Sequence, residues 1–219
     1  VGGRARGGKG ALGWIAKLPW NNAAFTAQVL AMISFIFGGA GGIVNASFNL
    51  NMLIHNTAWV PGHFHITVGT ATTLTFFGVT FWLVPHLTGK PLFSNRMALW
   101  ASWTWFVGMM VFALGMHWQG LLGVPRRAQV SNLAANLEGA YAAALLPRII
   151  TGVSGVILLL AVILYFTVLF ATVFSSKRLA AAQVPAIPFA DVVRLRPTGV
   201  LKLLDSLWAW FGLAVLLVV

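Results

Sequence analysis

The chain alternates long apolar stretches with short polar and basic ones. A helix of about 20 apolar residues crosses the hydrocarbon core of a bilayer, and the sequence offers five stretches of roughly that kind. The first opens at Ala23, directly after the polar pair Asn21 and Asn22. We therefore predict an all-α membrane protein, a polytopic bundle of transmembrane helices with spans at about 23–47, 57–86, 97–122, 146–174 and 204–219.

Composition supports a membrane location. Of the 219 residues, 59% are apolar and only 8% are charged, whereas soluble domains carry about 25% charged residues. The sequence has no cysteine, which excludes disulfides, thiolate ligands and iron–sulfur clusters held by this chain.

The formal charge of +11 would suit either nucleic acid or a membrane surface, and the positions of the charges favour the membrane. Loops rich in Lys and Arg stay on the cytoplasmic side, so we expect a cytoplasmic N-terminus, with 49–56 and 122–147 facing outward. Eleven of the fourteen basic residues fall on the expected cytoplasmic side: Arg4, Arg6, Lys9, Lys17, Lys90, Arg96, Lys177, Arg178, Arg194, Arg196 and Lys202.

Both ends are expected to be internal to a longer protein. The chain starts at Val1 without an initiator Met or a signal-peptide pattern, and its last apolar stretch continues to Val219. The segments 1–22 and 175–203 are basic or proline-containing connections rather than domains. We therefore expect residues 1–219 to form a portion of one transmembrane domain.

Two histidines lie one residue apart in the second predicted span, in the run Pro61-Gly62-His63-Phe64-His65. A helix turns about 100° per residue, so the two rings point to opposite sides and are poorly placed to share one metal. They can bind two different cofactors, with Phe64 between them. Imidazole is a common axial ligand of haem iron, and ionisable residues at membrane depth are functional hypotheses by default. The alternatives are interhelical hydrogen bonds for the rings and an ordinary kink at Pro61-Gly62.

Arg126 and Arg127 follow the third predicted span, near the membrane level expected for His63. Guanidinium groups bind carboxylates bidentately, and haem propionates are the carboxylates expected at that level. The alternative is an interfacial pair that binds lipid headgroups or water.

The other polar candidates are less specific. Asn51 and His55 could hydrogen-bond propionates, or cap a helix and face water. His86 is expected at the cytoplasmic interface, and the role of His117 is open. Six further residues are more typical of the core or the lipid-facing surface than of axial ligands: Met109, Met110, Met116, Trp100, Trp103 and Trp105.

Four motifs resemble subunit I of the haem-copper oxidase superfamily, especially the B-type cytochrome c oxidases. They are Gly-Gly-Ile-Val-Asn-Ala-Ser-Phe at 41–48, the run from His55 to His65, Pro-His-Leu-Thr-Gly-Lys at 85–90 and Gly-Val-Pro-Arg-Arg at 123–127. In order and spacing the resemblance covers essentially the whole chain. It implies the C-terminal portion of a subunit of twelve or thirteen helices, from the ninth helix onward.

The resemblance also implies residue roles. His63 would be the catalytic residue, as proximal ligand of the high-spin haem, and His65 would be one axial ligand of the low-spin haem, with Phe64 between the haems. Arg126 and Arg127 would bind propionates, and His55 would belong to the propionate and proton-exit region. At the position of Asn51 many B-type relatives have Asp, so this position keeps a hydrogen-bonding group but loses an ionisable one.

The cofactors implied are two haems, one low-spin and one high-spin, and copper at a binuclear centre held by residues outside this chain. The partners implied are the N-terminal half of subunit I, subunit II with a copper electron-entry site, cytochrome c or a similar donor, dioxygen and membrane lipid, but no nucleic acid. The location implied is the inner membrane of a prokaryotic cell, and the reaction is dioxygen reduction to water with proton translocation.

Three other functions fit the histidine pair. A nitric oxide reductase of the same superfamily would carry glutamates and non-haem iron in the other half. A non-catalytic dihaem cytochrome would hold two six-coordinate haems and bind no carbon monoxide. A transition-metal transporter would contain no haem, although the opposite directions of His63 and His65 suit a shared ion poorly.

Overall fold

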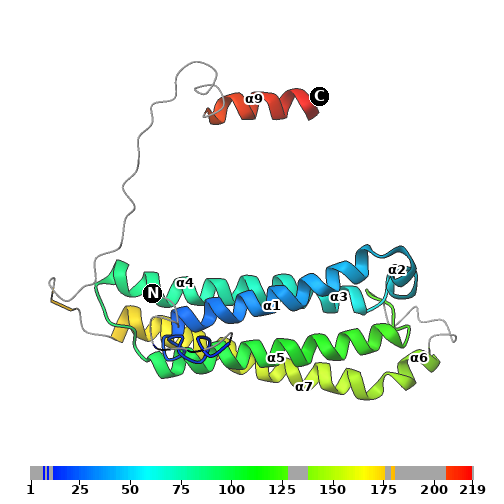
Figure 1. The fold of residues 1–219 in the computed structure, drawn as a ribbon, viewed down its shortest axis with the longest axis horizontal. Coiled ribbons are helices and arrows are strands. Elements are labelled where there is room, and N and C mark those ends of the chain that lie inside the picture. Colours follow the sequence, from blue (N-terminus) through cyan, green and yellow to red (C-terminus); the bar gives the residue numbers. More distant parts are fainter. Residues whose placement is uncertain are drawn as a thin grey trace. The chain divides into compact units, whose positions relative to one another are not determined.

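The computed structural model describes residues 7, 9, 12–127, 138–175, 179–180 and 206–218. The chain divides into two compact units, 1–185 and 186–219. In the first unit, helices α1, α4, α5 and α7 run side by side along their length (Figure 1). The elements of this unit are α1 (Ala23–Ala46), α2 (Phe48–Ile54), α3 (Trp59–Phe64), η1 (His65–Thr72), α4 (Thr73–Thr88), α5 (Asn95–Leu121), α6 (Glu138–Ala143), α7 (Leu145–Phe170) and η4 (Ala171–Ser175).

Four helical stretches are long and apolar enough to cross a membrane, which confirms the predicted all-α membrane bundle. Their bounds agree with the first four predicted spans to within a few residues: Ala23–Ala46, Trp59–Thr88, Asn95–Leu121 and Leu145–Phe174. The second unit contains α9 (Leu207–Val218), an apolar helix of 12 residues. It lies within the fifth predicted span but is shorter than a crossing requires, so that span stays a prediction.

The helix ends follow from local side chains. The Asn22 side chain accepts a hydrogen bond from the backbone N–H of Phe25 at the start of α1, and Ser94 does the same for Met97 at the start of α5. The second span ends at Gly89, whose φ of 62° is easily adopted by glycine.

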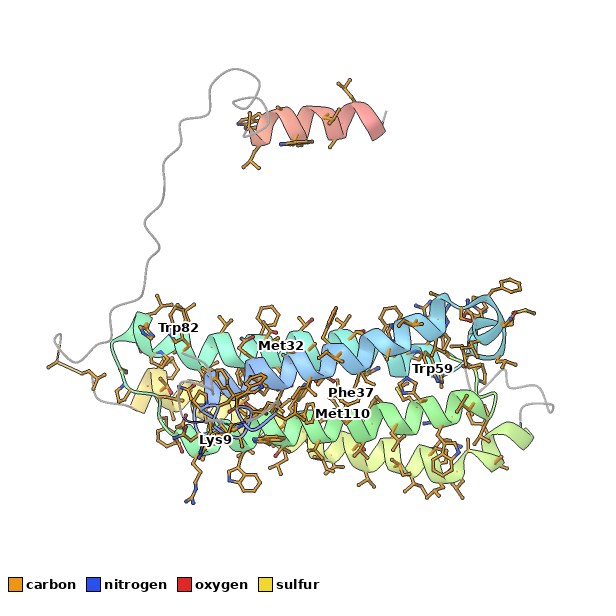
Figure 2. The ribbon with its side chains drawn as sticks, in the orientation of Figure 1. Lys9, Met32, Phe37, Trp59, Trp82 and Met110 are labelled. Atoms are coloured by element: carbon orange, nitrogen blue, oxygen red, sulfur yellow. The ribbon has the colours of Figure 1, made fainter. Side chains whose placement is uncertain are left out.

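Small side chains let the helices approach closely, because membrane helices gain their association from close packing. The exposed surface carries the large apolar side chains instead, such as Phe35, Ile36 and Leu159. Figure 2 shows side chains that point outward from the helices along the bundle. The fully buried positions of α1 and α5 include Ala27, Ser34, Ala98, Ala101 and Ser102.

One irregularity was not predicted: the second span changes to a π-helix at His65 and returns to α-helix at Thr73. Neighbouring groups bind carbonyls in this segment. Thr70 Oγ1 donates to the His65 carbonyl at 2.7 Å, and Trp105 Nε1 donates to the Gly69 carbonyl at 3.2 Å. π-helical turns are rare and are frequent at functional sites. The irregularity therefore begins at one of the two candidate ligands.

Gly120 of α5 gives a test of the close packing. An added Cβ there would overlap the backbone nitrogen of Trp59. We expect Gly120→Ala to lower the free energy of unfolding of the intact protein in detergent by about 1–3 kcal/mol, because overpacking forces the backbone to shift. The control is Gly152→Ala in α7, where an added Cβ meets nothing within 4 Å. Equal thermal denaturation midpoints for the two variants would contradict the packing argument.

Candidate functional site

His63 lies on α3 and faces α1. Its imidazole stacks on Trp59, with ring centroids 6.2 Å apart and planes 15° apart. The Nδ1 atom is buried and makes no hydrogen bond of ordinary geometry. An added Cβ on Gly41 of α1 would lie 2.8 Å from this Nδ1. Gly41 therefore provides the space for the ring, and Nε2 is the nitrogen left for a ligand bond.

His65 is held differently. Its Nδ1 lies 2.6 Å from the Pro61 carbonyl oxygen, and because a carbonyl only accepts, Nδ1 carries the proton. The Nε2 lone pair is then free for a metal. A backbone carbonyl on the second nitrogen is the usual way to orient a metal-binding histidine. The ring packs against Phe112 of α5 with centroids 4.9 Å apart.

The two imidazoles therefore have different neighbours, α1 for His63 and α5 for His65, as expected from opposite directions on one helix. Phe64 between them is 53% exposed, and its ring contacts His63 at 5.4 Å. Within the described residues, no three His, Cys, Asp or Glu side chains gather as a metal cluster. The geometry suits two separate metals with one imidazole each, as in haem ligation.

Arg126 is tied to the start of the histidine span by the backbone. Its N–H donates to the Asn56 carbonyl at 2.8 Å, and the Ala58 N–H donates to the Val124 carbonyl at 2.8 Å. Thr57 and Pro125 form an isolated antiparallel bridge between these bonds. The arginine pair is thus held beside the residues that precede α3, at the same end of the bundle as His63.

This backbone connection uses unusual conformations. Asn56 and Arg127 have φ of 60° and 55°, and Gly123 has φ of 81°. A left-handed conformation costs a residue with a Cβ roughly 1–2 kcal/mol, and such outliers cluster at functional sites. Arg126 is half-buried and Arg127 is exposed.

The arginine pair has no acidic residue nearby in the sequence, because the three acidic residues of the chain are Glu138, Asp191 and Asp205. The 127 residues that contain both candidate ligands and both arginines hold no carboxylate side chain. A ligand that brings its own carboxylates would therefore complement Arg126 and Arg127.

Asn51 lies in α2, and His55 is the residue that follows this helix, shortly before α3. The His55 N–H donates to the Asn51 carbonyl at 2.7 Å and closes α2, so the two residues lie one helical turn apart. His55 is exposed and Asn51 is half-buried. Their expected role toward propionates stays a prediction.

The packing of Trp59 and His117 around His63 was not predicted from the sequence. Trp59 is buried and contacts His117 of α5 edge-on, with ring centroids 4.5 Å apart. The spacing of Trp59 and His63, four residues on one helix, would have placed both on one face. His117 Nδ1 donates to the Ala113 carbonyl at 2.7 Å.

The remaining candidates lie at ordinary packing or surface positions, and the expected cytoplasmic location of His86 stays a prediction. Met109 is buried, and its methyl group lies 2.5 Å from where a Cβ on Gly69 would be. Trp100 is 63% exposed. His86 lies near the opposite end of the second span from His63, where its Nδ1 donates to the Trp82 carbonyl at 2.6 Å.

Comparison with known proteins gives one consistent family. Residues 7–154 match the family model described as cytochrome c and quinol oxidase polypeptide I. A cytochrome c oxidase subunit 1 of Thermus thermophilus is 47% identical over 220 residues, which cover 99% of this chain and 38% of that subunit. Another Thermus thermophilus sequence of the same name is 56% identical over 108 residues, covering 48% of this chain and 100% of that sequence.

A solved structure of a heme-copper terminal oxidase dimer also matches, with a TM-score of 0.67 and 32% identity over 84% of this chain and 32% of that chain. The chain thus spans about a third of the length of these two full-length relatives.

Gly41 gives a test of the pocket for His63. We expect Gly41→Ala to lower the haem-to-protein ratio of the intact purified protein, because the new methyl group forces the imidazole out of its present orientation. Gly39→Ala on the same helix is the control, since nothing lies within 4 Å of its added Cβ. Equal haem content in both variants would show that the space at Gly41 does not matter.

Proposed function

The chain belongs to the cytochrome c and quinol oxidase polypeptide I family, and from that premise we propose that it is the C-terminal portion of subunit I of a terminal respiratory oxidase. The complete enzyme would reduce dioxygen to water with electrons from cytochrome c and couple this reaction to proton translocation. The observation that carries the proposal is the pair of imidazoles on one span, each with Nδ1 turned to protein and Nε2 left for a metal.

His63 would bind the high-spin haem and His65 the low-spin haem, each through Nε2. His65 fits this role because the Pro61 carbonyl fixes its proton and its orientation. His63 fits because Gly41 opens space for its ring beside α1. When bound, the haems would supply electron transfer and, with copper held outside this chain, the reduction of dioxygen.

Arg126 and Arg127 would bind the propionates of the haems. Their backbone connection to Asn56 and Ala58 holds them at the start of the span that carries both histidines. Fixed positive charge also favours the reduced, less positive form of a nearby haem. Asn51 and His55 would hydrogen-bond in the same region, where the exposed His55 could exchange protons with water.

The rest of the centre would come from other chain segments. The copper ligands and the second ligand of the low-spin haem are expected in the N-terminal portion of subunit I, and electron entry in subunit II. The protein would lie in a prokaryotic inner membrane with residue 1 on the cytoplasmic side, because the basic residues collect in the segments 4–17, 90–96 and 177–202.

Replacing each histidine in turn tests the proposal in the assembled oxidase. We expect His65→Leu to remove the low-spin haem signal from the reduced-minus-oxidised spectrum, and His63→Leu to remove the carbon monoxide-sensitive signal. Both variants should consume no more oxygen than membranes without the enzyme, because each haem would lose an axial ligand.

The same spectra distinguish the other functions. Two six-coordinate haems without a carbon monoxide response would point to an electron-transfer cytochrome. Nitric oxide reduction without oxygen consumption would point to a reductase. Unchanged spectra in both histidine variants would remove the basis of the proposal.

Arg126 gives a separate electrostatic test. We expect Arg126→Gln to lower the midpoint potential of at least one haem in a redox titration of the assembled oxidase, because the loss of a nearby positive charge disfavours reduction. Arg148→Gln is the control, since the Arg148 guanidinium lies over the Tyr141 ring, 5.2 Å from its centroid. A larger shift in the Arg148 variant would contradict the propionate assignment.

A further inference from the structure

Trp59 contacts two histidines from two different helices. Its indole stacks with His63, four residues later on α3, and meets the ring of His117 on α5 at 83°. It is only 8% exposed. Figure 2 places Trp59 near one end of the bundle and Trp82 near the other. The proposed function assigns no role to Trp59 or His117.

Both of these side chains are held firmly by the backbone around them. Gly120 of α5 lies so close to Trp59 that an added Cβ would overlap the Trp59 Cβ. The His117 ring is fixed by its bond to the Ala113 carbonyl at 2.7 Å, and Gly62 of α3 packs against it, since an added Cβ there would lie 3.1 Å from His117 Nδ1. His117 and Trp59 therefore form a rigid contact between α3 and α5.

His63 lacks the bond within its own helix that orients the other three histidines; the backbone group against its ring belongs to Gly38 of α1. His65, His86 and His117 each donate Nδ1–H to a carbonyl four residues earlier. The Nδ1 of His63 makes no hydrogen bond of ordinary geometry. The plane of the His63 ring is therefore set from outside its own turn, by the backbone of Gly38 on α1 and by the packing of Trp59 and Gly41.

We propose that Trp59 and His117 are positioning residues that set the plane of the His63 imidazole, and thereby the strength of its bond to haem iron. The inference rests on the proposed function, because it takes His63 as the ligand of the high-spin haem. A packed ring limits rotation about the Cβ–Cγ bond of the histidine. The orientation of a ligand ring, set by its surroundings, is one of the ways in which a protein tunes a metal.

The test is the iron–histidine stretching band in the resonance Raman spectrum of the reduced, assembled oxidase. We expect Trp59→Phe and His117→Gln to shift or broaden this band while the low-spin haem spectrum stays unchanged. The matched control is His86→Gln, because His86 also donates to a carbonyl four residues earlier and contacts a tryptophan, Trp82, at 4.8 Å. Its band should coincide with that of the unmodified enzyme.

A further variant separates ring packing from hydrogen bonding. His117→Phe keeps an aromatic ring against Trp59 but loses the donor to the Ala113 carbonyl, so its band should lie closer to that of the unmodified enzyme than the His117→Gln band does. Where Trp59→Phe fails to assemble, the two His117 variants still decide the question.

The outcomes distinguish this inference from the proposed function. A band that is lost in His63→Leu but unmoved in Trp59→Phe and His117→Gln would overturn the positioning role alone. A band that survives in His63→Leu would overturn the assignment of His63 as ligand, and with it the proposed function of this site.

Discussion

The close approach of the second span to its two neighbours is the constraint on which the rest of the structure depends. In a membrane, helices cannot gain stability by leaving water, so they associate through close packing and buried hydrogen bonds. Glycine supplies the contact points here: Gly41 lies against His63, Gly62 against His117, and Gly120 against Trp59. These contacts bring α1 and α5 within reach of opposite sides of the same short helix.

The described residues of the loop after α5 are joined to this packed region by backbone bonds. Two backbone hydrogen bonds and the bridge of Thr57 with Pro125 fix residues 123–127 beside the start of α3. Backbone bonds of this kind do not depend on which side chains the loop carries. The main chain of Arg126 and Arg127 holds the loop in place, so their side chains are not needed for that purpose. The left-handed φ of Arg127 is an energetic cost of this arrangement.

Much of the fold follows from the sequence because the signals for membrane helices are strong and local. Length and apolar character predicted four spans that match the observed helices, and Asn22, Ser94 and Gly89 mark their ends by ordinary capping chemistry. The π-helix after His65 was not predicted; in the structure, Thr70 of the same segment and Trp105 of α5 donate hydrogen bonds to its carbonyls. For the site, the i, i+2 spacing predicted the directions of His63 and His65, but the partner helix of each ring depends on how the bundle packs.

The two histidines also differ in what holds them, and this difference has a physical consequence. A hydrogen bond is directional, so the ring of His65 is oriented by one carbonyl of its own helix and keeps that orientation when neighbouring helices shift. The ring of His63 depends instead on the backbone of Gly38 on the neighbouring α1 and on dispersion contacts, which fall off steeply with distance. Its orientation therefore responds to the spacing of α1, α3 and α5. A change in how the bundle packs would reach His63 before it reaches His65, although the two residues are separated by a single phenylalanine.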